Sequence, residues 1–448
     1  MAAIVPPAVA YFSMEIALES SIPTYAGGLG VLAGDTLRSA ADLGVPSVAV
    51  TLVHRKGYFA QRIDEHGMQT ELPDSWPVEE RLEPVAPRVA VEIEGRTVVV
   101  RGWRYVVHGQ GGAVLPVYLL DTDCPENAEA DRRVTDSLYG GDKPERLAQE
   151  IVLGLGGVRL LRALGFDRIR RFHMNEGHAA LIVLELLNER LGESAAMPSP
   201  AAIAAVRDRC AFTTHTPVPA GHDTFPADLA SRLLGALAWG RLQALGQTSD
   251  LNMTTLALRH SRFTNAVALP HSTVSERLFP GYAIPAITNG VHPATWAAPA
   301  LQALFDRRLP GWRADAFVLR HALGIPREEL WAAHLAAKEA LVHRVNSVAP
   351  AHHHLHRDVL TLGFARRMTA YKRPHLLFSN LERLRTMGKH VGPLQIVLAG
   401  KAHPRDGEGK ALIRRLNEAA AELRGRVTVA FLPGYDMNLA RLLVSGVD

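Results

Sequence analysis

The sequence predicts an α/β protein made of two Rossmann-like, doubly wound domains. Its 448 residues exceed the roughly 250–300 residues at which a single hydrophobic core stops growing. Short apolar strands alternate with helices in the N-terminal portion, and the same alternation starts again after residue 300. Strands that alternate with helices are typical of parallel sheets covered on both faces. We therefore expect an N-terminal domain over residues 1–300 and a C-terminal domain over residues 301–448.

The first domain begins with a βαβ-like unit. Val9–Phe12 is expected to be a strand, Val31–Leu43 a helix that ends before Gly44, and Pro46–Val53 a buried, Val-rich strand. The other elements expected before residue 300 are a hairpin of Val98–His108 and Val114–Leu120, a glycine-interrupted helix over Pro144–Leu164, and short strands at Ala211–Thr214 and Ala286–Asn289.

The second domain is predicted from three apolar runs. The strands are Thr361–Phe364, Leu394–Ala399 and Val427–Leu432, with one helix starting at Pro374 and another over Lys410–Leu423. The alternation stops at Asp448, where a further buried strand is expected. On this interpretation the second domain is incomplete.

Composition excludes several classes of protein. The formal net charge is only +4, which argues against nucleic acid as a partner. No stretch approaches the ~20 apolar residues of a membrane span, and the start has no signal-peptide pattern. The two cysteines, Cys124 and Cys210, are too few for a disulfide framework. A cytoplasmic protein is expected.

Glycines cluster in the run Ala26-Gly27-Gly28-Leu29-Gly30, directly before an expected helix. Glycine lets the main chain approach a ligand closely, and a helix N-terminus presents free N–H groups to an anion. The run also fits the GxGxxA dinucleotide pattern, but the acidic residue expected about 20 positions later is absent. These features favour a phosphate- or sugar-binding loop over an NAD site, and a plain tight turn stays an alternative.

A basic run, Arg366–Arg373, follows the first strand of the second domain. Ligands of open α/β sheets bind beyond the carboxyl ends of strands. Arginine offers phosphate a bidentate fork, and lysine offers it a compact charge. Arg367 and Lys372 would diverge on a helix and converge only on a loop. The alternative, a solvated basic loop, is disfavoured by the position after a buried strand.

Three groups of histidines raise the question of a catalytic or metal site. His215 follows a short strand, and taken alone it is typical of a hydrogen-bonded structural residue. Glu176 and His178 lack the HExxH spacing and favour a capped helix start. The histidines of His352–His356 have no cysteine or carboxylate at zinc spacing. No metal site is predicted.

Taken together, seven stretches resemble the glycogen/starch (α-glucan) phosphorylase family, in its compact bacterial type, nearly from end to end and in the same order. They are Tyr25–Asp35, His173–His178, Thr213–Pro217, Ile287–Val291, Gly363–Arg373, Ala399–Ala402 and Phe431–Asn438. The resemblance implies two Rossmann-like domains in the GT-B arrangement. It also implies a glycosyltransferase that cleaves α-1,4-glucan with inorganic phosphate, releasing α-glucose 1-phosphate with retention at the anomeric carbon. A homo-oligomer is compatible with it.

By similarity, His215, Arg367 and Lys372 are the catalytic residues, with Arg367 and Lys372 holding the substrate phosphate. Arg366 faces the phosphate of the cofactor, pyridoxal phosphate. For substrate binding, the resemblance implies main-chain contacts from Gly27 and Gly28 to the phosphate region, and a hydrogen bond from Asn289, like one from His215, to the transferred glucosyl unit.

The chain departs from the family in one respect. The family attaches pyridoxal phosphate to a lysine in a Glu-Ala-Ser-Gly-Thr…Met-Lys segment, expected shortly after Val444–Asp448, and this sequence holds no such segment. We therefore expect the chain by itself to be inactive. A non-catalytic glucan-binding remnant and a sugar-nucleotide glycogen or starch synthase are the alternatives.

Overall fold

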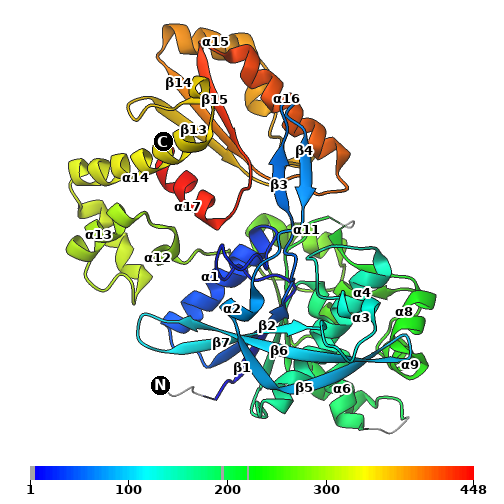
Figure 1. Cartoon of the computed structure of the whole chain (residues 1–448). Helices are drawn as coiled ribbons and strands as arrows, with labels where there is room; N and C mark the ends of the chain where they lie inside the picture. Colours follow the sequence, from blue (N-terminus) through cyan, green and yellow to red (C-terminus); the bar gives the residue numbers. More distant parts are fainter. Residues whose placement is uncertain (1–5, 193–195, 219–220) are drawn as a thin grey trace. The chain divides into compact units, whose positions relative to one another are not determined.

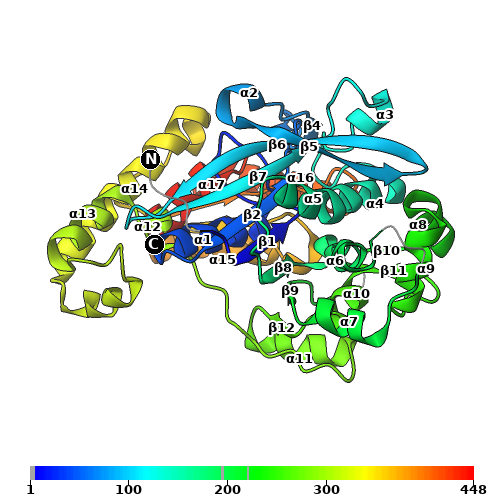
Figure 2. The same ribbon diagram turned by 90° about the horizontal axis from the view of Figure 1, so that it is seen from below.

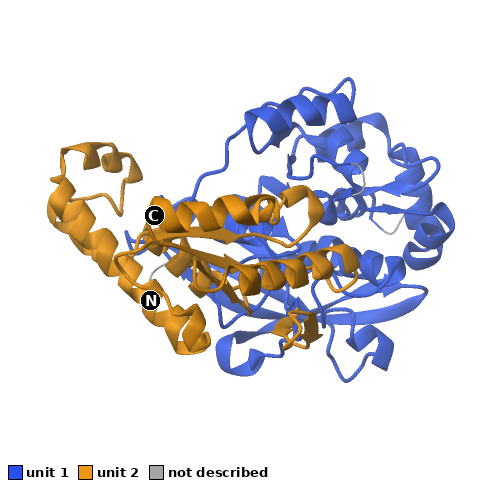
Figure 3. Ribbon diagram, turned by 90° about the horizontal axis from the view of Figure 1, so that it is seen from above, with its two compact units in different colours: residues 1–58, 74–291 blue, residues 59–73, 292–448 orange. Residues whose placement is uncertain are grey.

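The computed structural model describes residues 6–192, 196–218 and 221–448. They form two compact units, coloured separately in Figure 3. Unit 1 comprises residues 1–58 and 74–291, and unit 2 comprises residues 59–73 and 292–448. Residues 59–73 thus pack with unit 2 although unit 1 surrounds them in the sequence. The division into domains 1–300 and 301–448 stays a prediction.

Unit 1 is built on an eight-stranded sheet with the order β12-β9-β8-β1-β2-β7-β6-β5. Its strands from β12 to β7 are parallel, and β6 and β5 continue it antiparallel. The strands are β1 (Val9–Ser13), β2 (Ser47–Leu52), β5 (Glu83–Ile93), β6 (Arg96–His108), β7 (Val114–Asp121), β8 (Arg171–Asn175), β9 (Cys210–Thr214) and β12 (Phe263–Ala266). A separate two-stranded ribbon joins β10 (Thr224–Phe225) to β11 (Leu251–Asn252).

Helices cover both faces of this sheet, as Figures 1 and 2 show. α1 (Gly28–Asp42) packs on one face, while α4 (Lys143–Ile151), α5 (Gly157–Ala163) and α6 (Ile182–Leu191) pack on the other. The remaining helices are α2 (Val78–Arg81), α3 (Glu129–Arg132), η2 (Gly177–Ala179), α7 (Pro200–Arg207), α8 (Ala227–Leu234), α9 (Ala236–Ala244), α10 (Met253–Arg259) and α11 (Leu269–Leu278).

The expected glycine-interrupted helix is present as α4 and α5, joined by the π-helical turn η1 (Val152–Gly156). Glycine is required there because neighbouring elements come very close. A Cβ on Gly154 would lie 2.8 Å from the Cβ of Leu181, and one on Gly157 would lie 2.6 Å from the Phe12 ring. The two glycines therefore allow α4 and α5 to pack closely against their neighbours.

The predicted strand Ala286–Asn289 is wrong. Only Ala286 forms a bridge, to Ala266 at the end of β12, and the rest of the segment has no strand geometry. The side chains from Ile287 to Val291 are largely exposed, so no buried face holds this segment against the sheet.

Unit 2 is built on a three-stranded parallel sheet with the order β13-β14-β15. Helices α14 and α17 pack on one face and α15 and α16 on the other. The strands are β13 (Leu360–Ala365), β14 (Leu394–Ala399) and β15 (Val427–Leu432), with the hairpin β3 (Ala60–Ile63) and β4 (Gln69–Leu72). The helices are α12 (Pro293–Trp296), α13 (Pro299–Arg308), η4 (Ala316–Gly324), α14 (Arg327–Val348), η5 (Ala351–His353), η6 (Ala370–Lys372), η7 (Leu376–Phe378), α15 (Leu381–His390), α16 (Gly407–Leu423) and α17 (Met437–Gly446).

The helix predicted to start at Pro374 does not form there. Arg373 has a left-handed backbone with φ of 53°, which interrupts any helix at this point. The helix α15 begins at Leu381 instead, where the Asn380 side chain accepts the N–H of Arg383 and caps it.

The predicted α/β class is confirmed by the parallel sheets and the helices on both faces of each. In the described ranges, no helix is long and apolar enough to cross a membrane. In both units, loops that carry predicted site residues follow the carboxyl ends of parallel strands, where ligands of such folds bind.

Candidate active site

In unit 1, the predicted site residues lie beyond the carboxyl ends of neighbouring strands. The glycine turn follows β1, and His215 directly follows β9. Asn289 donates its main-chain N–H to the carbonyl of Val267, just after β12, which pairs with β9. The sheet therefore gathers the turn, His215 and Asn289 at one edge, although they are far apart in the sequence.

The glycine turn already holds an anionic group of the protein itself. Glu15, which is only 2% exposed, accepts the main-chain N–H groups of Ala26 at 2.6 Å and Gly27 at 3.2 Å. Its second oxygen accepts the Tyr139 hydroxyl at 2.9 Å. The carboxylate thus occupies part of the N-terminus of α1, whose dipole favours negative charge. The N–H of Gly28 has no acceptor in the described part of the chain.

His215 is oriented by a relay across three strands. Asn175, at the end of β8, donates its Nδ2 to Ser13 Oγ at 3.0 Å, so its Oδ1 faces His215 Nε2 at 2.6 Å. Nε2 therefore carries the hydrogen and Nδ1 is the free acceptor of the neutral ring. Burial lowers the pKa of His215, although the carboxylate of Glu176 opposes this shift.

Glu176 and His178 form the capped turn that the sequence indicates. Glu176 accepts the main-chain N–H of His215 at 2.8 Å and the Thr216 hydroxyl at 3.0 Å, and it caps the short helix η2 at Gly177. Its backbone has φ of 75°, an unusual conformation for a residue other than glycine. The carboxylate therefore fixes the loop that carries His215.

A buried charged cluster lies beside this loop, and the sequence did not indicate it. Asp223 pairs with Arg146 Nη2 at 2.7 Å and with His178 Nε2 at 3.3 Å. Glu150 is fully buried, and Arg146 Nη2 lies 3.6 Å from its carboxyl. Arg146 also covers the ring of Tyr139, 4.8 Å from its centre, which connects the cluster to Glu15.

The pKa values of the two acids in this cluster are shifted in opposite directions. Burial, together with the negative charge of Asp223, raises the pKa of Glu150 well above its usual value. Burial alone would also raise the pKa of Asp223, but His178 and Arg146 hold it far below its usual value. The negative charge of the pair therefore resides on Asp223. The only sequence signal was the Arg146–Glu150 pair at i,i+4 spacing within α4.

In unit 2, the basic run follows β13 as predicted. Arg366 and Arg367 are exposed, and no carboxylate pairs with either of them or with Lys372 in the described ranges. Lys372 lies in η6 with its Nζ 4.6 Å from the centre of the Tyr371 ring. Met368 is fully buried and anchors the run in the core. Unpaired cations at a strand end suit a phosphate or another small anion.

The described residues match only one end of pyridoxal phosphate. Arg366 suits its phosphate. The aldehyde requires a lysine amine that a desolvated setting keeps reactive. The buried Lys338 is instead bound to Asp448 at 2.6 Å, Lys401 donates to the Phe59 carbonyl at 2.8 Å, and Lys410 pairs with Glu71 at 2.8 Å. The aldehyde end finds no fitting lysine among the described residues, so no reaction step is derived through the cofactor.

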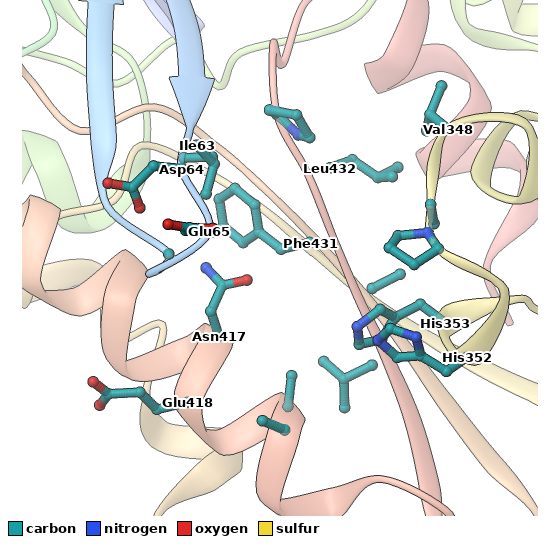
Figure 4. A pocket seen from close by; sticks show the side chains of 18 of the residues that line it. Ile63, Asp64, Glu65, Val348, His352, His353, Asn417, Glu418, Phe431 and Leu432 are labelled. Carbon is teal, nitrogen blue, oxygen red and sulfur yellow. The ribbon is translucent and has the colours of Figure 1, made fainter.

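Unit 2 also contains a cavity of about 930 Å³. Figure 4 shows the Phe431 ring between the hairpin turn, with Asp64 and Glu65, and the imidazoles of His352 and His353. None of the predicted site residues lines it. In the described ranges no cluster of histidine, cysteine or carboxylate side chains has metal-binding geometry, including the His352–His356 segment.

Comparisons with known proteins give the family. A maltodextrin phosphorylase of Thermococcus litoralis is 38% identical over 98% of this chain and 56% of its own length. A glycogen phosphorylase of Mycobacterium tuberculosis is 38% identical over 99% of this chain and 57% of its own length. One of Aquifex aeolicus is 34% identical, covering 98% of this chain and 69% of its own length. A scan against protein-family profiles finds no match.

The chain therefore belongs to the α-glucan (glycogen) phosphorylase family, as the sequence motifs predicted. It spans little more than half the length of the first two of these relatives. These three relatives are named as phosphorylases and not as sugar-nucleotide synthases.

Proposed function

We propose that this chain carries sugar- and phosphate-binding residues of an α-glucan phosphorylase. In that reaction the bond between C1 of the terminal glucosyl unit and O4 of the next unit breaks. C1 forms a new bond to a phosphate oxygen with retention of configuration, and the proton of hydrogen phosphate ends on O4. The products are α-glucose 1-phosphate and a glucan shorter by one unit.

The observation that carries the proposal is the basic run after β13, in a chain of this family. Two exposed guanidinium groups that have no carboxylate partner among the described residues offer an anion charge-assisted, bidentate contacts. We assign Arg367 and Lys372 to the substrate phosphate and Arg366 to the phosphate of pyridoxal phosphate. Such cations offset the repulsion between two phosphates. When bound, the cofactor would supply an acidic phosphate group.

In unit 1 we assign His215 and Asn289 to the glucosyl unit. The free Nδ1 of His215 would accept a sugar hydroxyl, since Nε2 is engaged with Asn175. The Asn289 side chain is exposed and offers an amide donor and acceptor. Gly27 and Gly28 are assigned to the phosphate region through their main chain. The N–H of Gly28, which has no acceptor among the described residues, supports this role better than that of Gly27, whose N–H is donated to Glu15.

The proposal is tested by titrating the full chain with inorganic phosphate and, separately, with maltoheptaose, using calorimetry. Glucose 1-phosphate release in the presence of pyridoxal phosphate is measured in parallel. Binding of both ligands, with phosphate affinity lowered by Arg367→Ala, supports the assignments. Binding of maltoheptaose alone would identify a non-catalytic glucan-binding protein. Absence of binding for both ligands would contradict the proposal.

A further inference from the structure

The hairpin of β3 and β4 is hydrogen-bonded to the loops that follow β14 and β15 in unit 2. Its two buried amides, Gln61 and Gln69, are 7% and 3% exposed, and they bond to each other at 2.8 Å. Gln61 donates to the carbonyl of Gly400 at 2.9 Å and accepts the N–H of Gly434 at 2.9 Å. These two glycines follow β14 and β15.

Gln69 makes two more hydrogen bonds to the loop after β14. Its Oε1 accepts the N–H of Ala402 at 2.9 Å, and its Nε2 donates to the carbonyl of the same residue at 2.8 Å. Two further contacts reinforce the hairpin: Lys401 Nζ donates to the Phe59 carbonyl, and Lys410 pairs with Glu71. Because the amides are buried and doubly bonded, removing either leaves main-chain groups without a partner.

The loop after β14, which the hairpin binds, is also hydrogen-bonded to the basic run. Arg366 donates its N–H to the carbonyl of Ala399 at 3.3 Å, and Met368 donates to that of Lys401 at 3.0 Å. Gly400 lies so close that a Cβ there would stand 1.9 Å from the Arg366 carbonyl oxygen. The main chain of residues 366–368 therefore follows the position of residues 399–401.

We propose that Gln61 and Gln69 are positioning residues that hold the phosphate-binding run of unit 2 in place through residues 400–402. This inference rests on the proposed function, which assigns Arg367 to phosphate. The two glutamines are buried, and we assign neither of them to phosphate. They keep the loop after β14 from shifting, and a displacement of about 1 Å at a binding group is enough to weaken it strongly.

The chain offers a matched control in Gln395. This amide is 1% exposed and lies at the opposite end of β14, where it donates to the His356 carbonyl at 2.8 Å and to Thr361 Oγ1 at 2.7 Å. Gln395→Met removes a similarly bonded buried amide from β14, at the end away from the loop that the hairpin binds. It should lower stability like Gln69→Met while leaving the basic run in place.

The test measures affinity for inorganic phosphate by calorimetry on the full chain. We expect Gln69→Met to lower the affinity for phosphate about tenfold, which is the value of one charge-assisted contact. Gln395→Met should leave this affinity unchanged. We also expect Gln69→Met to have little further effect in an Arg367→Ala background, because the contact it positions is then gone. Equal losses in Gln69→Met and Gln395→Met, or no loss in Gln69→Met, would overturn the inference.

Amide hydrogen exchange separates this inference from the proposed function. Gln69→Met, and independently Gln61→Met, should speed exchange at the Met368 amide while β2 and β14 stay protected, and Gln395→Met should not. If the wild-type chain binds no phosphate, the proposed role of the basic run fails, and exchange still decides whether the glutamines hold it. An unchanged Met368 amide in both glutamine variants would refute the positioning role.

Discussion

The carboxylate of Glu15 accepts the main-chain N–H of Gly27 at 3.2 Å, so an acidic side chain of the protein occupies the turn where an anion is expected. The same carboxylate also accepts hydrogen bonds from the main-chain N–H of Ala26 and from the Tyr139 hydroxyl. Glu15 therefore closes the turn and places a negative charge beside the main chain that we propose contacts phosphate.

Glu15→Gln should destabilise the protein and strengthen anion binding. The amide keeps an acceptor oxygen but loses the charge, which costs about 1–2 kcal/mol of unfolding free energy. Losing a negative charge at the N-terminus of α1 should raise phosphate affinity a few-fold. Urea unfolding and phosphate titration check the two effects. Glu19→Gln, nearby on the surface, serves as the control, and weaker phosphate binding in Glu15→Gln would contradict this interpretation.

Asp223→Asn should destabilise unit 1 by about 3 kcal/mol at pH 7, because it leaves the largely buried Arg146 and His178 without their partner. The pKa of Asp223 is held below its usual value, so its stabilising effect is present above the unfolded pKa near 3.9 and is lost as the pH falls below it. The difference in unfolding free energy between the wild type and the variant should therefore be constant from pH 7 to 5 and shrink below pH 4. Thermal unfolding against pH measures this, with the exposed Asp228→Asn as control. A deficit that grows on acidification would refute the assignment.

The affinity for phosphate should fall by about 10–150-fold in Arg367→Ala and in Lys372→Ala, because each variant loses one charge-assisted contact. Maltoheptaose affinity should not change, since neither residue is assigned to the sugar. Arg383→Ala, on the exposed side of α15, controls for the loss of a positive charge. If Arg383→Ala weakens phosphate as much as the other two variants, general electrostatics and not a specific site explains the binding.

His215→Ala should lower maltoheptaose affinity about tenfold, because one buried hydrogen-bond acceptor is removed from the sugar site. Phosphate affinity should stay unchanged. Calorimetry with both ligands provides the measurement, and His108→Ala, an exposed histidine on β6, is the matched control. The opposite pattern, with phosphate lost and glucan retained, would exchange the roles assigned to the two units.

Reduction of the chain with borohydride in the presence of pyridoxal phosphate should give no single stoichiometric pyridoxyl-lysine. Lys338, Lys401 and Lys410 are already bound to Asp448, Phe59 and Glu71, and exposed lysines should react only weakly and unselectively. Mass spectrometry of the digested protein locates the label. One fully modified lysine, with glucose 1-phosphate production, would show that the chain does contain a lysine that fits the aldehyde.

Local patterns in the sequence were sufficient for the buried strands. The apolar runs Leu394–Ala399 and Val427–Leu432 are strands with the predicted limits, and β2 lies within the run Pro46–Val53. Gly44, with φ of 63°, ends the helix before β2 as expected. Each of these features depends on contacts within a few residues or on burial of a continuous apolar run, so composition and spacing carry the signal.

Only the tertiary structure decided which polar groups meet. Nothing near Glu15 in the chain indicates that it binds Gly27 and Tyr139, and nothing in residues 59–73 indicates that Gln61 and Gln69 pack into unit 2. The residue pairs whose contacts hold the glycine turn and the basic run are separated by 11 to more than 300 residues in the sequence. Such contacts are set by the order of strands in a sheet and by the need of buried polar atoms for partners. Neither constraint appears in a local pattern, which is why the sequence determined the continuous buried strands, the family and the candidate residues, while the folded chain alone determined how those residues are held.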